Sequence, residues 1–289
     1  VTLILSVSKG SDIINAEYMY DNQSKDHRIR LIAASDIADA ACFADIPYDI
    51  VERTKFHSGI NTVSDVFPNT SFAVLQDELK GMAYFTEGAH ETERISGGSL
   101  AFTVLRATGA ITRDIQTLSV NGGEAWLCPA NQSLRKDSGR IGVMFYSGGY
   151  ESAHIPQKSV GFRTPLIGFA APEDRRKFSG GRTAVQSTKL EELFYLPDAY
   201  KSAQIPENQT AFDLESENVM VTAFKKSEDT RSLVIRLYNF SGKAETVTLR
   251  IDGTIYKSGL SEEGAELLGQ NEATVHVAPK QLVTLRINK

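Results

Sequence analysis

The sequence predicts an all-β protein, with a large antiparallel β-sandwich followed by a small β-sandwich. Apolar and polar residues alternate over most of the chain, as in residues 233–237 and 283–287, which is typical of strands with one buried face. Glycine pairs such as Gly148-Gly149 and Gly180-Gly181 separate these runs, as turns do. Convincing helical patterns are few, and residues 189–194 are a candidate for a turn or two of helix. Many short strands between turns indicate a sandwich or a barrel.

The length of the chain, 289 residues, is that of about two average domains. A polar, proline-containing stretch at residues 205–208 is the best candidate for a boundary. We therefore expect a large sandwich domain over residues 1–205 and a small one over residues 206–289. The strand pattern already starts at Val1, without an initiator Met, so we expect a piece of a longer protein, with processing of a precursor as the alternative.

Charge and hydropathy argue against two partners of this chain, nucleic acid and a membrane. Lys and Arg number 31 against 36 Asp and Glu, a net charge of −5, and this lacks the basic excess of a nucleic-acid binder. No apolar run approaches the ~20 residues that cross a membrane. The two cysteines, Cys42 and Cys128, are too few for a disulfide scaffold, which favours reduced thiols and a cytoplasmic location. Composition and charge do not decide whether the chain assembles into a homo-oligomer.

Motifs that carry chemistry are missing from the sequence. There is no phosphate-binding glycine loop, no H-E-x-x-H zinc motif, no calcium loop and no G-x-S-x-G nucleophile. Five histidines are scattered without metal-ligand spacing: His27, His57, His90, His154 and His276. We therefore predict neither a catalytic residue nor a metal site in this chain.

The first segment rich in functional side chains is residues 22–30. Strand alternation places Asp26, Arg28 and Arg30 on one face, and His27 with Ile29 on the other. One interpretation is a structural network in which the aspartate and the arginines brace two packed sheets and His27 covers the core. The other is a polar face that binds sugar hydroxyls. Because arginine suits partly buried ion pairs, we favour the structural network.

The second such segment is residues 100–106. Leu100, Phe102 and Val104 share a strand face, and Arg106 continues that face as the run ends. An arginine at the end of a buried strand can donate several hydrogen bonds into a cleft. It can equally pair with a neighbouring carboxylate, and the pattern does not decide between these roles.

Several segments, in order along the chain, resemble the C-terminal half of glycoside hydrolase family 38, the α-mannosidases. The matching segments are Asn22 with residues 25–31 (N…DHRLR in the family), 49–53 (FD-x-V-x-R), 67–73 (FP-x-x-x-WA), 81–91 (G-x-A…G-x-x-EY), 100–107 (LALTLLRA), 128–132 (TP-x-AQ) and 222–239 (LK…ILRLYN). Phe72 stands where the family usually has Trp, and Phe224 where it often has Leu. These departures indicate a bacterial-type member.

The resemblance implies a galactose mutarotase-like β super-sandwich followed by a small β-sandwich. It implies an enzyme that hydrolyses terminal α-mannosides, whose zinc and catalytic carboxylates lie in an N-terminal domain absent from this chain. The fragment is then inactive alone and holds no cofactor. Its expected partners are its own N-terminal catalytic domain and an α-mannoside oligosaccharide. The resemblance also makes Arg106 the residue expected to reach the wall of the substrate cleft.

Two other functions fit an isolated β-sandwich. One is an aldose-epimerase-like enzyme that uses a histidine and a glutamate as acid and base, with His27 or His154 as the histidine. The other is a carbohydrate-binding module, which needs exposed aromatic platforms. Tyr146 and Tyr150 flank a glycine-rich loop and are candidates for a platform, whereas we expect Trp126 in the core.

Overall fold

The computed structural model describes residues 1–37, 40–54, 56–57, 63–64, 66–95, 98–110, 127–164 and 210–288. Antiparallel strands dominate these residues, which confirms the predicted all-β class. No described helix is long and apolar enough to cross a membrane. The boundary expected at residues 205–206, the helical turn expected at 189–194 and Trp126 all lie outside the described residues.

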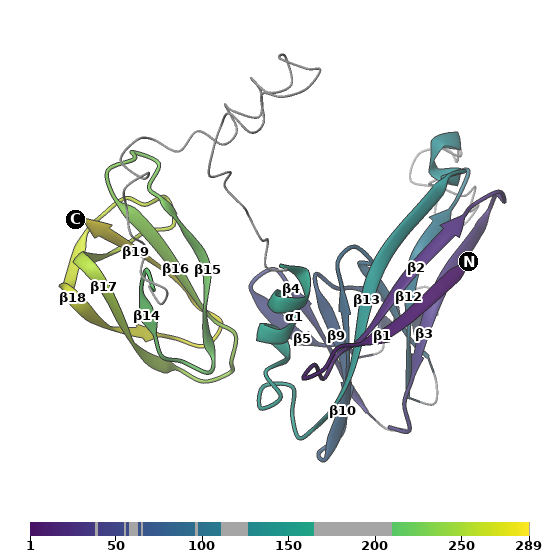
Figure 1. The fold of residues 1–289 in the computed structure, drawn as a ribbon, viewed down its shortest axis with the longest axis horizontal. Helices are drawn as coiled ribbons and strands as arrows, with labels where there is room; N and C mark the ends of the chain where they lie inside the picture. The colour runs from purple at the N-terminus through teal and green to yellow at the C-terminus, as the bar shows by residue number, and fades with distance from the viewer. Residues whose placement is uncertain are drawn as a thin grey trace, which may run out of the picture. The chain divides into compact units, whose positions relative to one another are not determined.

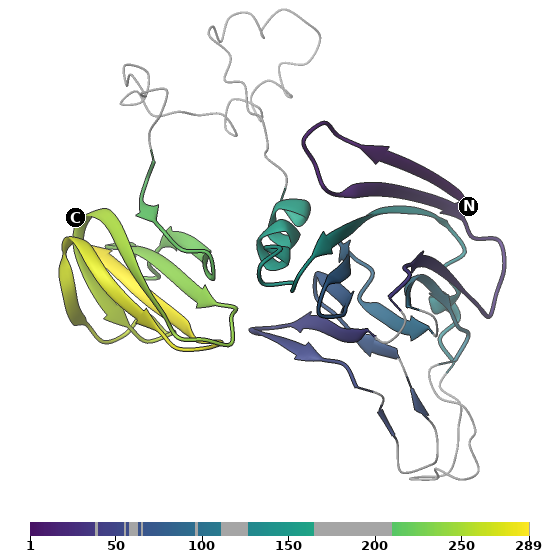
Figure 2. The same cartoon turned by 90° about the horizontal axis from the view of Figure 1, so that it is seen from below.

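The first region, residues 1–164, contains two main sheets (Figures 1 and 2). The seven-stranded sheet has the order β1 (Thr2–Val7), β2 (Ile14–Asp21), β13 (Lys136–Ser147), β10 (Lys80–Thr86), β9 (Phe72–Gln76), β4 (Ala41–Ile46) and β5 (Asp49–Glu52). The four-stranded sheet has the order β3 (His27–Ala34), β12 (Ser99–Ala107), β11 (Glu91–Ile95) and β8 (Val66–Pro68). The short strands β6 (Phe56–His57) and β7 (Val63–Ser64) form a separate pair.

The main core joins these two sheets. Tyr84 of β10 stacks on Phe102 of β12, and both are fully buried. Alternate residues Ile29, Leu31 and Ala33 of β3 pack against the same core. The residues between them therefore point away from it, because successive side chains of a strand leave on opposite faces.

A second apolar cluster covers the other face of the seven-stranded sheet. Val74 and Phe85 of its central strands meet Ile155 and Phe162 of the helix α1 (Ile155–Arg163). Strands β9 and β10 are thus buried on both faces, which explains why their sequences are apolar at nearly every position rather than alternating.

The second region, residues 210–288, forms a small sandwich around a sheet of six strands. Their order is β14 (Asp213–Leu214), β17 (Glu245–Ser258), β19 (Leu282–Asn288), β16 (Leu233–Asn239) and β15 (Val219–Lys226), with β18 (Glu266–Val277) also paired to β17. Strand β17 changes register between Arg250 and Thr254, where Gly253 has a φ of 130°. A Cβ atom there would lie 2.7 Å from the carbonyl oxygen of Asn288, so the bend requires glycine.

We predict that Phe102→Ala destabilises the first region by about 3–5 kcal/mol, because it removes the ring that stacks on Tyr84 in the centre of the core. Chemical denaturation followed by fluorescence measures the change. Ile32→Ala on the neighbouring strand is the matched control: Ile32 is 60% exposed and Phe102 0%. The control is expected to change stability by less than about 0.5 kcal/mol, and an equal effect of both variants would contradict the assigned core.

Candidate functional site

The candidate site is a cluster of charged side chains on the outer face of the four-stranded sheet. Arg28 and Arg30 come from β3, Arg106 from β12, and Glu91 and Glu93 from β11. The register places Arg28 directly opposite Arg106 on the adjacent strand. The structure therefore brings together the arginines of both segments that the sequence singles out. We call these five residues the arginine cluster.

Two carboxylates hold the arginine cluster together. Glu91 accepts hydrogen bonds from Arg28 at 3.2 Å, from Arg106 at 3.3 Å and from the Thr103 hydroxyl at 2.7 Å. Glu93 accepts from Arg28 at 3.2 Å and also from Arg30. Two arginines directly opposite each other repel. The shared carboxylate of Glu91 offsets this repulsion between Arg28 and Arg106.

The arginine cluster carries a net positive charge at neutral pH. Partial burial raises the pKa of Glu91, but the Thr103 hydrogen bond and the two arginines more than compensate and hold that pKa below its ordinary value. Three guanidinium groups then face two carboxylates. The Arg106 side chain is 66% exposed, and among the described residues its ion-pair partner is Glu91. This arrangement suits a hydroxyl or carboxylate oxygen as the ligand.

The position of Arg106 corrects the expected alternation. We predicted that it continues the face of Leu100 and Phe102, but it lies on the opposite, outer face. Thr103 pairs with Arg30 and Leu105 with Ile29, so Val104 is an extra residue in a β-bulge. Beyond the bulge Leu105 and Ala107 are buried and Arg106 faces out. The carbonyl of Val104 accepts a hydrogen bond from the Tyr20 hydroxyl at 3.3 Å.

Asp26 lies apart from the arginines that we expected it to join. It precedes β3 in a left-handed conformation, with a φ of 55°. Its carboxylate accepts hydrogen bonds from the Gln132 side chain at 2.7 Å and from the Gly109 N–H at 3.0 Å. The Gln132 hydrogen bond is the main reason why the pKa of Asp26 is lowered. The side-chain amide of Asn22 also binds Gln132, by donating to its backbone carbonyl at 2.8 Å.

The network around Asp26 thus joins two segments that are far apart in sequence. It fixes the 3-10 turn at Pro129–Gln132 against the start of β3. His27 begins β3 opposite Ala107, on the face away from Arg28, as alternation predicts. Its Nδ1 atom is buried and has no hydrogen-bond partner among the described residues.

Sequence reasoning did not identify Glu93 as a partner of the arginines, or Thr103 as a partner of Glu91. A signal was present, because Glu91 and Glu93 are two residues apart on one strand and so share a face. Like charges at that spacing indicate cations on a neighbouring strand, since an uncompensated pair would repel.

The residues expected in the alternative functions are not arranged for them. Tyr146 is buried and donates its hydroxyl to Gln76 at 2.9 Å, so it offers no exposed stacking surface. The ring of Tyr150 packs against Phe43. His154 precedes α1 and is exposed. Within the described ranges, no three His, Cys, Asp or Glu residues gather where they could hold a metal ion.

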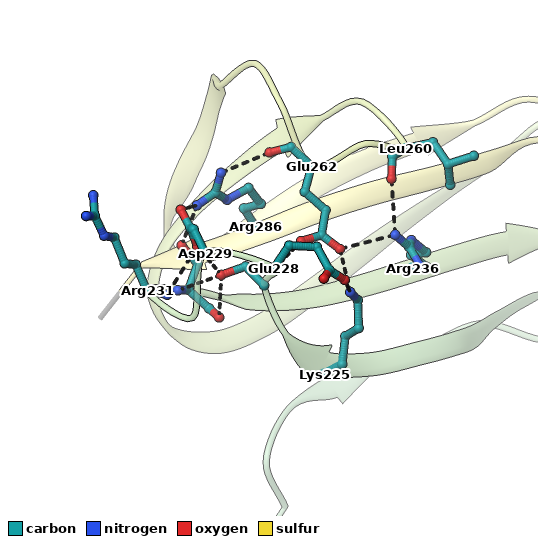
Figure 3. Close-up of polar contacts among 10 residues, drawn as sticks. Lys225, Glu228, Asp229, Arg231, Arg236, Leu260, Glu262 and Arg286 are labelled. Carbon is teal, nitrogen blue, oxygen red and sulfur yellow. Dashed lines mark hydrogen bonds and ion pairs between the residues drawn. The ribbon is translucent and has the colours of Figure 1, made fainter.

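A second charged cluster closes one end of the small sandwich (Figure 3). Its centre is Glu262, whose side chain is only 5% exposed. The carboxylate accepts from Lys225 at 2.8 Å, from Arg236 at 3.2 Å and from the Glu228 N–H at 2.8 Å. These contacts lower the pKa of Glu262, with the Lys225 hydrogen bond as the largest cause.

Further contacts tie this cluster to the last strand. Arg286 of β19 donates to the Glu262 carbonyl at 2.9 Å and to the Asp229 carboxylate at 2.9 Å. A hydrogen bond from Ser227 is the main reason why the pKa of Asp229 is lowered, to about 2. The partners that the structure describes come from strands β15, β16 and β19 and from nearby turns, including the β17–β18 turn with Leu260, so we interpret this cluster as a structural closure.

The described residues thus define an all-β region, with two main sheets in its first part and a small sandwich in its second. Residues 218–285 match the family model described as "Glycosyl hydrolases family 38 C-terminal beta sandwich domain". Together with the matches below, this confirms the resemblance to the C-terminal β region of glycoside hydrolase family 38.

Three relatives align with nearly the whole chain. A putative mannosylglycerate hydrolase of Halalkalibacterium halodurans is 25% identical over 300 residues, which cover 98% of this chain and 28% of that protein. The crystal structure of an alpha-mannosidase from Enterococcus faecalis V583 has a TM-score of 0.75 at 18% identity, over 98% of this chain and 28% of that one. A family 38 protein structure from Enterococcus faecalis has a TM-score of 0.73 at 19% identity, over 98% and 29%. The chain thus spans about 28% of the relatives' length.

We predict that Glu262→Gln lowers the melting temperature of the small sandwich at pH 7 and has little effect in acid. The lowered pKa of Glu262 means that its stabilising contribution is present above the unfolded value near ~4.3 and is lost as the pH falls through the folded value. Melting curves between pH 7 and pH ~3 measure this difference. The matched control is Glu263→Gln, which changes the exposed neighbour. A pH-independent gap between Glu262→Gln and the unsubstituted protein would contradict the electrostatic origin.

Proposed function

We propose that this chain is the non-catalytic C-terminal β region of an α-mannosidase that hydrolyses terminal α-mannosides. The match to a family 38 C-terminal domain and the family motifs along both regions support this. The aligned relative named as a mannosylglycerate hydrolase supports a mannoside as the substrate class. In this proposal the partners of the chain are its own N-terminal catalytic domain and an α-mannoside oligosaccharide.

The reacting groups then belong to the catalytic domain. A retaining glycosidase needs two carboxyl groups about 5 Å apart, one of which must be protonated to act as the acid. Glu91 does not suit that role, because Thr103 and its arginines hold its pKa low and keep it ionised. We assign the zinc to the catalytic domain as well. With two cysteines in 289 residues, a cytoplasmic location also belongs to the proposal, and homo-oligomerisation stays open.

The arginine cluster is the feature that best supports a role of this chain in the substrate cleft. Arg106 combines high exposure with a local excess of positive charge, on a sheet held by its core. Placed at the edge of a cleft, it can donate hydrogen bonds to sugar hydroxyls and so position the substrate. Glu91 and Arg28 would orient the guanidinium from the protein side.

We predict that Arg106→Ala in the full-length enzyme lowers kcat/KM for an aryl α-mannoside by about tenfold or more, since a hydrogen bond to a charged group contributes roughly 1.5–3 kcal/mol. The matched control is Arg135→Ala. Arg135 is 69% exposed and pairs with Asp137 at 2.8 Å, which resembles the pairing of Arg106 with Glu91. An unchanged kcat/KM for Arg106→Ala would remove this residue from the cleft.

We also predict that the 289-residue chain alone does not hydrolyse an aryl α-mannoside, with or without added zinc. The described residues contain no cluster of ligands for the metal, and the two carboxylates of the arginine cluster are neutralised by arginines. Release of the chromogenic aryl group measures turnover. Clear hydrolysis by the purified chain would contradict the proposed division of labour.

A further inference from the structure

The arginine cluster holds one more arginine than its ion pairs need. Arg28 alone bridges both carboxylates, with one nitrogen 3.2 Å from Glu91 and another 3.2 Å from Glu93. Arg30 makes a further ion pair with Glu93. These two arginines already balance the charge of the two carboxylates. A network that only braces the sheet would therefore be complete without Arg106.

Arg106 brings the third positive charge to a position that disfavours it. It lies directly opposite Arg28 on the adjacent strand, where like charges repel. Glu91 accepts hydrogen bonds from both arginines and so reduces the repulsion, but one shared carboxylate does not neutralise two guanidinium groups. This placement favours a further anionic partner for Arg106.

The described residues around the cluster on the outer face do not supply that negative charge. The residues in register with Glu93 across the sheet are uncharged, and they are Ile32, Ala101 and Val66. Asp26 does not compensate either, because its carboxylate binds the Gln132 side chain and the Gly109 N–H. The positive excess therefore stays at the surface, on the side chain of Arg106.

The chemistry of the guanidinium group indicates which ligand uses this excess. Arginine offers hydrogen-bond donors and no acceptor. A sugar hydroxyl both donates and accepts and carries no charge, so a neutral ligand leaves the positive excess uncompensated. A carboxylate or a phosphate carries negative charge, accepts hydrogen bonds from two N–H groups at once and matches the planar fork of arginine.

We propose that the arginine cluster binds an anionic group of the substrate, a carboxylate or a phosphate, with Arg106 as the residue in contact. This inference rests on the proposed function, which places the cluster at the substrate cleft, and it narrows the substrate class to α-mannosides with a negatively charged substituent. Arg106 is the accessible member, with 66% of its side chain exposed against 36% for Arg28 and 29% for Arg30. An exposed positive excess also attracts an anionic ligand before contact.

The test compares thio-linked α-mannosides, which resist hydrolysis, as ligands of the full-length protein. One carries a carboxylate on its aglycone, a second carries a neutral carboxamide in the same place, and a third carries a phosphate there. Calorimetry gives the dissociation constants. We expect at least one of the two anionic compounds to bind about tenfold more tightly than the carboxamide, or better, because hydrogen bonds to an ionised group are roughly twice as strong as neutral ones.

Substitutions of Arg106 separate its charge from its hydrogen bonds. Arg106→Gln keeps an amide donor and removes the charge, so we expect the preference for the anion to fall by about tenfold. Arg106→Lys keeps the charge and is expected to retain most of the preference. The matched control is Arg135→Gln, at an arginine that is 69% exposed and paired with Asp137. This control is expected to leave the preference unchanged.

Equal binding of all three compounds would overturn the inference, as would a preference that Arg106→Gln leaves intact or a protein that binds none of them. Hydrolysis of a neutral aryl α-mannoside tests the proposed function separately. A full-length protein that hydrolyses it without any preference for an anion retains the function and loses the anionic subsite. A protein that binds the anionic compound through Arg106 and hydrolyses no mannoside keeps the subsite and loses the function.

Discussion

The burial of one face of the four-stranded sheet is the constraint on which the candidate site depends. Ile29, Leu31 and Phe102 must face the core, because an exposed register would uncover several large side chains at roughly 1.5–3 kcal/mol each. That burial leaves Arg28 and Arg30 only the outer face. The arginine cluster is therefore positioned by apolar packing behind it rather than by its own ion pairs, which are partly exposed and contribute little stability.

The β-bulge at Val104 adapts this constraint to the end of β12. It keeps Leu105 and Ala107 in the core and turns Arg106 outward, next to Arg28. Glu91 then bridges the two arginines, so the cluster holds two like charges side by side without strong repulsion. The sheet presents the guanidinium group of Arg106 on an exposed side chain. Such a group is suited to positioning a ligand and not to proton transfer, because arginine stays protonated.

Much of the fold was predictable because its periodicity is simple. The alternation in residues 233–237 and 283–287 appears as β16 and β19, whose register is regular and whose inner residues are buried. The separation of Arg28 from His27 on opposite faces of β3 follows from the same rule. The resemblance to family 38 that the motifs indicate is confirmed by the family-model match and by the aligned relatives.

The parts of the site that the sequence did not predict depend on features that interrupt the two-residue alternation of a strand. The bulge at Val104 reversed the face of Arg106, and the left-handed backbone of Asp26 turned its carboxylate toward Gln132. Residues 26 and 132 are too far apart in sequence for a local pattern to reveal their contact.

The central claim is that the outer face of this sheet lines the substrate cleft of an α-mannosidase. A crystal structure of the full-length protein with a mannose-derived inhibitor tests it most directly. The account predicts the Arg106 guanidinium within hydrogen-bond distance, about 2.7–3.2 Å, of an inhibitor oxygen, with Glu91 still bound behind it. An inhibitor bound elsewhere, with the arginine cluster open to bulk solvent, would contradict the claim.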